Sequence, residues 1–312
     1  MHDNPPNVAV LLTVFNRPDH TKKVLKAIKE ARPTKLYVHA DTPRADNPKS
    51  LSLRDQCLDL VEKETFEFPV EVRVANEPLG CGRGVSAAIS WFFQREEMGI
   101  ILEDDTLPTP DFFLFARELL EKYQDDERIG VICGNNPSGE DTSNSYFFSK
   151  SRSSWGWATW RRAWKNYDFT LGALESKQSA DVLENLADTK IYRRLWKDKF
   201  SKVMTGEVDT WDWQWQLTLT SQNQLACFPG ANLVTNIGFG PEATHTTSAP
   251  PAEVLKTGKI EWPLQHPKYV VPTLDFGRDP QQLLGLALFR TLPAKLLRLV
   301  KKKLTVAKKP LG

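Results

Sequence analysis

The sequence has few cysteines and no long apolar run. Its four cysteines, Cys57, Cys81, Cys133 and Cys227, include no CxxC pair. Such scattered cysteines are not the framework of a disulfide-stapled secreted domain, so we expect free thiols in a reducing cytoplasm. No segment has the roughly 20 consecutive apolar residues that span a bilayer. The sequence does not start with a basic segment followed by an apolar run, which is the pattern of a secretory signal. We therefore expect a cytoplasmic protein.

The sequence also lacks an excess of either charge. Lys and Arg number 41 and Asp and Glu number 39, for a net charge of +2. A nucleic-acid partner held by bulk electrostatics needs a large basic excess, so we exclude one. With 40% hydrophobic and 26% charged residues, the composition is that of a globular protein with a sizeable core.

Tryptophan is the residue in excess. Ten are present, and eight of them lie between Trp155 and Trp215. Such a group builds either a heavy core or a wall that binds flat apolar surfaces such as the faces of sugars. For any single tryptophan, core packing is the commoner role.

The first 135 residues alternate between two hydrophobic periods. Short apolar runs typical of strands lie at residues 8–14, 35–39, 70–74, 98–102 and 130–133, with helical patterns between them. Repeated strand–helix alternation predicts an α/β fold with an open, mainly parallel sheet and helices on both faces. Ligands of such sheets bind beyond the carboxyl ends of the strands. That rule selects residues 13–17, 39–41, 76–83 and 103–105.

The second half of the chain is less regular. We expect irregular structure over residues 140–180, helices near 181–203 and 211–221, and short strands at 225–228 and 232–235. Residues 281–309 alternate leucine with lysine and arginine, which predicts a basic amphipathic helix. Such a helix either contacts an anionic membrane surface or is solvated.

Three consecutive acids, Glu103, Asp104 and Asp105, end the strand predicted at 98–102. Neighbouring carboxylates repel one another, and burying them is costly unless a cation compensates. Mg²⁺ and Mn²⁺ bind carboxylate oxygens and complete their shells with substrate phosphates. The pattern favours a metal site, and the alternative is a solvated acidic turn in front of a helix.

Other segments carry weaker signals. The glycine-rich run at 80–84 precedes a helix, where backbone N–H groups can approach a phosphate and Arg83 can add a bidentate contact. A plain flexible turn explains that run equally well. Arg17, directly before a proline, either holds a nucleotide or belongs to a helix cap. His245 is either a structural histidine or an imidazole metal ligand.

Asp212 lies between Trp211 and Trp213. Water-poor surroundings raise the pKa of a carboxyl group toward that of a useful general base. The alternative is that Asp212 caps the helix predicted at 211–221, with the tryptophans packed below it.

Together these motifs resemble a known family. Val-Phe-Asn-Arg-Pro at 14–18, Ile-Leu-Glu-Asp-Asp at 101–105 with Pro-Asp-Phe-Phe downstream, and Trp-Asp-Trp at 211–213 are similar to the N-acetylglucosaminyltransferase I family. The chain resembles more closely a group of bacterial proteins described as hemolytic-protein-like or as nucleotide-diphospho-sugar transferases. The segment at 154–164, which contains four tryptophans, looks characteristic of that group.

The resemblance implies a GT-A fold and an inverting glycosyltransferase. It places a nucleotide-sugar-binding half at 1–135, an acceptor-binding half with the catalytic base at 136–245, and a C-terminal extension at 246–312. The acceptor is expected to be a glycan or lipid-linked hydroxyl, and the C-terminal tail is expected to contact the inner face of the membrane. The sugar transferred would be a hexose or an N-acetylhexosamine from a UDP-sugar.

The resemblance also assigns roles to individual residues. Asp105 matches the acid that coordinates Mn²⁺ or Mg²⁺, Asp104 the acid that contacts the ribose, and Glu103 the acid that contacts the donor sugar. Asp212 matches the catalytic base, although the family has Trp-Asp-Asp-Trp where this chain has one acid fewer, so Asp209 is the alternative base.

The remaining candidates complete the predicted site. Asp41 matches the acid that contacts uracil and Arg17 the arginine that contacts the nucleotide, while His245 is a predicted second metal ligand. Further donor contacts are expected from Thr13, Phe15, Asn16 and Arg83. Acceptor contacts are expected from Trp155, Trp157, Trp211 and Trp213.

Two other functions fit parts of the sequence. A non-catalytic module that binds nucleotide sugars or glycans would keep the fold, but the intact acids at 103–105 argue against it. A sugar-1-phosphate nucleotidyltransferase would carry a glycine-rich, basic signature after the first strand, where this chain has Asn-Arg-Pro.

Overall fold

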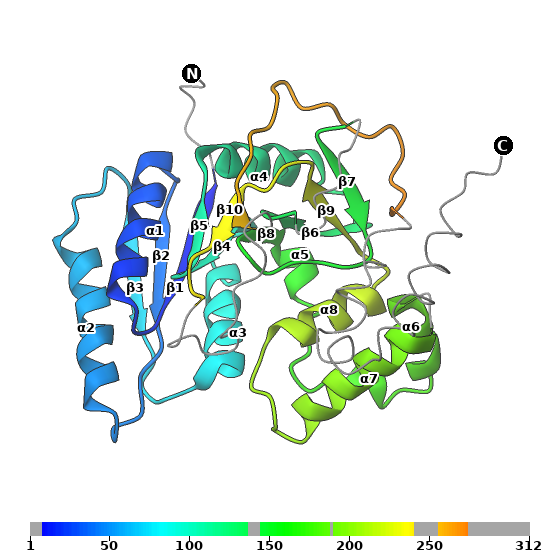
Figure 1. Cartoon of the computed structure of the whole chain (residues 1–312), viewed down its shortest axis with the longest axis horizontal. Helices are drawn as coiled ribbons and strands as arrows, with labels where there is room; N and C mark the ends of the chain where they lie inside the picture. The colour runs from blue at the N-terminus through cyan, green and yellow to red at the C-terminus, as the bar shows by residue number, and fades with distance from the viewer. Residues whose placement is uncertain (1–7, 137–143, 188–189, 240–254, 274–312) are drawn as a thin grey trace, which may run out of the picture. The chain divides into compact units, whose positions relative to one another are not determined.

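An eight-stranded mixed sheet forms the centre of the chain, with the strand order β3-β2-β1-β4-β8-β6-β9-β7 (Figure 1). This is a computed structural model, and it describes residues 8–136, 144–187, 190–239 and 255–273. All of them belong to one compact unit that ends at Thr273.

Four parallel strands build one half of the sheet: β1 (Ala9–Val14), β2 (Leu36–Ala40), β3 (Val70–Val74) and β4 (Met98–Glu103). Every residue of β1 and β2 is buried because helices cover both faces. That burial is why these strands are continuous apolar runs in the sequence.

Helices pack on both faces of these strands, as predicted. The helices α1 (Pro18–Ala31), α2 (Pro48–Lys63) and α4 (Pro110–Lys122) share one hydrophobic core with β1 and β2. Helix α3 (Gly80–Phe93) covers the other face, where Phe92 lies edge-on to Tyr37 of β2 with ring centroids 5.2 Å apart.

The other half of the sheet contains β8 (Trp157–Trp160), which runs antiparallel between β4 and β6 (Ile129–Cys133). Strand β9 (Leu225–Pro229) is parallel to β6, and β7 (Tyr146–Ser149) forms the edge. The prediction of irregular structure over 140–180 was wrong at β7, at β8 and at the short helix Arg161–Trp164. Each of the two strands has only four residues, and pairing with other strands of the sheet stabilises it.

Strands from both predicted halves therefore join one sheet. The fold class is confirmed as α/β with a largely parallel sheet covered on both faces.

The remaining elements flank this half of the sheet. They are α5 (Arg161–Trp164), the short 3₁₀ helix η1 (Gly172–Leu174), α6 (Ser179–Leu186), α7 (Lys190–Met204) and α8 (Asp212–Ser221). The helix predicted over 181–203 is two helices, α6 and α7. A separate antiparallel pair, β5 (Thr106–Pro108) with β10 (Val234–Asn236), follows the acidic end of β4.

Two expectations from the sequence concern the cysteines and membrane-spanning helices. All four cysteines are free thiols, as predicted. Within the described ranges, no helix has the length and apolar character needed to cross a membrane. His245 and the basic tail predicted at 281–309 lie outside the described residues.

Candidate functional site

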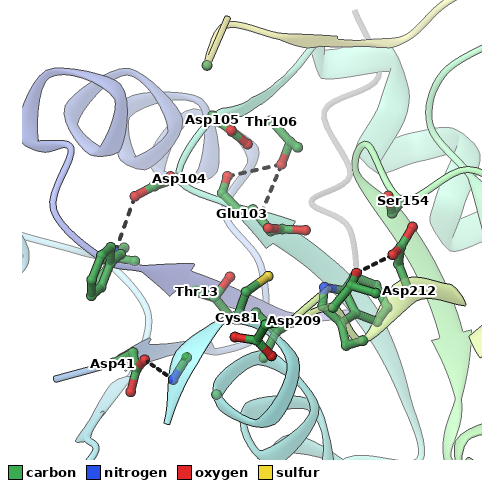
Figure 2. A pocket seen from close by; sticks show the side chains of 18 of the residues that line it. Thr13, Asp41, Cys81, Glu103, Asp104, Asp105, Thr106, Ser154, Asp209 and Asp212 are labelled. Carbon is green, nitrogen blue, oxygen red and sulfur yellow. Dashed lines mark hydrogen bonds between the residues drawn. The ribbon is translucent and has the colours of Figure 1, made fainter. Parts of the chain in front are cut away.

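A pocket of about 800 Å³ lies at the carboxyl ends of β1, β2 and β4, where the α/β rule predicts a ligand. Its walls include the acidic end of β4 and the start of α3. The segment that leads into α8 also lines the pocket, so residues from both predicted halves face one space (Figure 2).

The three acids at the end of β4 line this pocket, and so does Arg17. Arg17 Nη1 lies 2.7 Å from Asp105 Oδ2 and 3.5 Å from Asp104 Oδ1. The backbone N–H of Phe15 also donates to Asp104, at 3.2 Å. Arg17 therefore compensates part of the negative charge of the cluster.

Burial opposes ionisation of two of these acids. It raises the pKa of Asp104 to about 7, with a further contribution from the nearby charge of Asp105. Burial likewise raises the pKa of Glu103 well above its usual range, and the charges of Asp105 and Asp104 add to the rise. The cluster thus carries more potential negative charge than its surroundings stabilise.

The turn after β4 fixes the position of Glu103. The hydroxyl of Thr106 accepts a hydrogen bond from the Glu103 N–H at 2.9 Å and lies 3.0 Å from the Glu103 carbonyl oxygen. Figure 2 shows both contacts, with the Glu103 carboxyl group directed into the pocket. That carboxyl group has no hydrogen-bond partner among the residues that the structure describes.

The glycine-rich run is the first turn of α3, and two of its N–H groups already have carboxylate partners. Leu79 and Gly80 donate to Asp41 at 3.2 and 3.0 Å, and Gly82 donates to Asp209 at 2.9 Å. Two acids therefore cap α3 in the positions where a phosphate would bind. Gly80 has a φ of 77°, and a side chain there would collide with the Asp209 carboxylate.

Asp212 begins α8 on the opposite side of the pocket. Its carboxylate accepts a hydrogen bond from the Thr210 hydroxyl and lies 3.2 Å from Arg152 Nη2. The Arg152 side chain is only 4% exposed, and it also donates to the Asp212 carbonyl oxygen. Sequence reasoning missed Arg152 because a lone arginine in a segment without pattern carries no signal.

The tryptophans divide between the pocket wall and the core. Trp155, Trp211 and Trp213, for which acceptor contacts are predicted, line the pocket, and Trp211 is itself only 2% exposed. Trp157 is 1% exposed and stacks on Trp211, with ring centroids 5.4 Å apart. Trp157, for which an acceptor contact is predicted, does not line the pocket, because it belongs to the buried strand β8 and supports Trp211 from behind.

The structure brings together most of the predicted donor residues. Those that line the pocket are Thr13, Phe15, Arg17, Asp41, Glu103, Asp104 and Asp105. Asn16 is instead bonded to the Ser50 hydroxyl at 2.8 Å, and the Arg83 guanidinium lies over the Phe169 ring, 5.1 Å from its centroid. Neither Asn16 nor Arg83 lines the pocket.

Several lining residues were not predicted individually. They include His39, Cys81, Ser154, Thr210 and Asn236. The only sequence signal for His39 is that it falls in the strand-end segment 39–41. The pKa of the Cys81 thiol is raised by burial and by the nearby acids, so this thiol is a weak nucleophile.

The acids fit one kind of metal site. The described part of the chain contains no cluster of three or more His, Cys, Asp or Glu side chains that could hold an ion by itself. Mg²⁺ and Mn²⁺ also bind through one or two carboxylates together with substrate phosphates. The raised pKa values of Glu103 and Asp104 beside Asp105 mark acids whose charged forms a divalent cation would stabilise, which suits that second arrangement.

Comparisons with known proteins give limited likenesses. No family model matches the sequence, and no curated protein matches it. A mannosyltransferase from Pyrobaculum calidifontis, solved in complex with GDP-Man and Mn²⁺, aligns with a TM-score of 0.36 and 14% identity over 58% of this chain. The aligned part is 52% of that enzyme, so this chain spans about half of its length.

Two further solved structures are similar at the same level. A UDP-glucose pyrophosphorylase complexed with UDP-glucose has a TM-score of 0.36 and 9% identity, over 71% of this chain and 89% of its own. A 4-diphosphocytidyl-2C-methyl-D-erythritol synthase from Anaerococcus prevotii has a TM-score of 0.33 and 10% identity, over 55% of this chain and 77% of the synthase. Likenesses this distant establish neither a family nor an activity for this chain.

Proposed function

We propose that this protein is a metal-dependent, inverting glycosyltransferase that moves a sugar from a UDP-sugar to a hydroxyl group of a glycan or lipid-linked acceptor. The observation that supports the proposal is the pairing of two acidic sites in one pocket. The cluster of Glu103, Asp104 and Asp105 faces one side, and Asp212 with its tryptophans faces the other.

The donor would bind on the side of β1 and β4. Asp105 would hold Mn²⁺ or Mg²⁺ together with the donor phosphates, and His245 remains a predicted second ligand. The ion, when bound, would offset the charge that develops on the leaving nucleoside diphosphate. Arg17, now paired with Asp104 and Asp105, would contact the same phosphates.

The acceptor would bind between Trp155 and Trp213, with its hydroxyl group near Asp212. Asp212 takes the proton of that hydroxyl, and the oxygen forms a bond to the anomeric carbon. The bond between that carbon and the diphosphate oxygen breaks on the opposite face, so the configuration inverts. Arg152 holds the Asp212 carboxylate in place through its ion pair.

A thermal-shift screen tests the donor site. The purified protein is heated with UDP-, GDP-, CMP- and dTDP-sugars in Mn²⁺ and in EDTA. We expect stabilisation by UDP-sugars that EDTA abolishes, because a ligand of the folded state raises its stability. Asp105→Ala should lose the effect, whereas Asp59→Ala, which changes an exposed acid on α2, should keep it.

A non-catalytic nucleotide-sugar-binding module is the second candidate. It is favoured by one observation, that Asp105 and Asp212 each already have an arginine partner. Metal-dependent donor binding without sugar release to any acceptor or to water would support the module. Stabilisation by no nucleotide sugar would contradict the glycosyltransferase and the nucleotide-sugar-binding module, and would leave a module that binds glycans.

A further inference from the structure

His39 is a buried histidine without a partner at the edge of this pocket. It lies on β2, is 1% exposed and is one of the residues that line the pocket. Neither ring nitrogen has a hydrogen-bond partner among the described residues. Leaving a buried polar group unsatisfied costs about 1–3 kcal/mol, so such a side chain calls for a ligand or water.

Strand register places His39 relative to the acid cluster. Thr13 of β1 is paired with Glu103 of β4 on one side and with His39 of β2 on the other. Residues paired across neighbouring parallel strands project from the same face, so these three side chains form a row. His39 and Glu103 are two strand spacings apart, about 10 Å.

The row lies on the face of the sheet that α3 covers. The His39 ring is 6.5 Å from the ring of Trp91 on α3, measured between centroids. Burial lowers the pKa of His39 to about 4, and the nearby charge of Arg73 adds to the fall. At neutral pH the ring is therefore uncharged and offers one donor and one acceptor.

The family resemblance assigns the contact with the uracil ring to Asp41, but the Asp41 carboxylate is already hydrogen-bonded to backbone N–H groups. Its Oδ1 accepts hydrogen bonds from the N–H groups of Thr42 and Leu79, and its Oδ2 accepts one from Gly80. These bonds cap α3 and leave the carboxylate committed to the fold. At the same end of the pocket, both ring nitrogens of His39 lack a hydrogen-bond partner among the described residues.

We propose that His39 binds the nucleoside of the donor, through hydrogen bonds from its neutral ring to the base or the ribose. The inference rests on the proposed function and refines its donor site. Phosphates and their cation belong at the acid cluster, because a neutral imidazole cannot offset their charge. The nucleoside then extends along the row, past Thr13, to the end of the pocket where His39 lies.

Nitrogen-15 NMR of the histidine rings tests the inference in the wild-type protein. The signals of His39 are assigned by their absence in a His39→Phe variant. Addition of UDP with Mg²⁺, which unlike Mn²⁺ is diamagnetic and does not broaden nearby signals, should shift the Nδ1 or Nε2 signal of His39 and leave His266 unchanged. His266 is a suitable internal control because it bonds to Tyr146 at 2.9 Å and does not line the pocket.

Affinity measurements by calorimetry provide the second test. His39→Phe keeps a ring of similar size and removes both nitrogens, so UDP should bind about 10- to 100-fold more weakly. Inorganic pyrophosphate with Mn²⁺, which reaches only the acid cluster, should bind wild type and variant equally. His39→Asn and His39→Gln place an amide near the position of Nδ1 or Nε2, respectively, and recovery in one of them identifies the nitrogen used.

The outcomes separate this inference from the proposed function. If UDP binds but the His39 signals do not move, or His39→Phe binds UDP as tightly as wild type, His39 is not a ligand contact and the function stands. Equal loss of pyrophosphate binding would show that the variant damages the whole pocket, and would overturn the inference as well. If no nucleotide binds the wild type, the proposed function and the inference fail together.

Discussion

At the scale of single residues, the site combines acids and a histidine whose usual charge states are opposed by burial. Glu103 and Asp104 are pushed toward their protonated forms, and His39 is kept neutral. Perturbed groups gathered in one cleft are typical of functional sites, although structural networks also produce them. Arg17 and Arg152 are examples of such structural networks, because each forms an ion pair with an acidic side chain of the site.

The depressed pKa of His39 predicts a pH-dependent stability. The unfolded chain binds a proton at this residue below about pH 6.5, whereas the folded chain binds one only below about pH 4. Stability should therefore fall as the pH drops from 6.5 toward 4. The free energy of unfolding should be about 2 kcal/mol lower at pH 4.5 than at pH 8 because of His39 alone.

Urea unfolding of wild type and His39→Phe at the two pH values measures this contribution. The difference in the free energy of unfolding between the two proteins should change by about 2 kcal/mol between the two pH values, since the two proteins share all other titrating groups. An unchanged difference would show that His39 titrates normally in the folded protein.

Asp212→Asn tests the proposed base. General-base assistance typically contributes about 10²–10⁴-fold, so turnover should fall by that factor while donor affinity stays within about twofold. Steady-state kinetics of sugar transfer or donor hydrolysis, with calorimetry for the donor, separates the two quantities.

Asp209→Asn is the matched comparison, because Asp209 is the alternative base and its carboxylate caps α3. We expect it to lower stability by about 1 kcal/mol and to retain most of the turnover. The reverse result, with Asp209→Asn inactive and Asp212→Asn active, would transfer the role of base to Asp209.

At the scale of elements, β8 decides how the two sides of the pocket meet. This strand inserts antiparallel between β4, which carries the acid cluster, and β6. Its first residue, Trp157, stacks on Trp211, which directly precedes Asp212. The strand therefore links the position of the acid cluster to that of the proposed catalytic base, Asp212.

Trp157 and Trp155 provide a matched pair at this element. Trp157→Ala should lower the free energy of unfolding by about 3–5 kcal/mol, because it empties a fully buried site. Trp155 is half-buried at the pocket wall, so Trp155→Ala should cost about 1 kcal/mol or less and should weaken acceptor binding instead. Denaturant unfolding of both variants measures the difference, and equal losses would contradict the division between core and wall.

At the scale of the described unit, segments far apart in the sequence complete one sheet. Strand β4 meets β8 some 60 residues later, and β6 meets β9 almost 100 residues later. Without these partners, residues 1–135 would leave β4 and β6 with unpaired edges and exposed apolar faces.

Fragments 1–135 and 136–273 should therefore fail to fold when expressed alone. Neither should give a cooperative thermal transition in circular dichroism, whereas 1–273 should unfold in a single transition. A cooperative transition for 1–135 alone would show that this half folds independently and would contradict the expectation.

Local patterns in the sequence determined the α/β class and the edge of the sheet where the pocket lies. Strands buried on both faces are apolar throughout, as in β1 and β2, and ligands of such sheets bind at the carboxyl ends of their strands. The acid cluster at Glu103 was predictable for the same reason, since it directly follows such a strand.

Only the tertiary structure decided which predicted residues share a pocket and which are used by the fold. Whether Trp157 lines a wall or fills a core depends on the strand pairing of β8, which is set by partners distant in the chain. Whether the N–H groups at Gly80 and Gly82 are free depends on Asp41 and Asp209, which arrive from other elements. The unpartnered ring of His39 is likewise visible only when all its neighbours are in place, because hydrogen-bond satisfaction is a property of the packed structure.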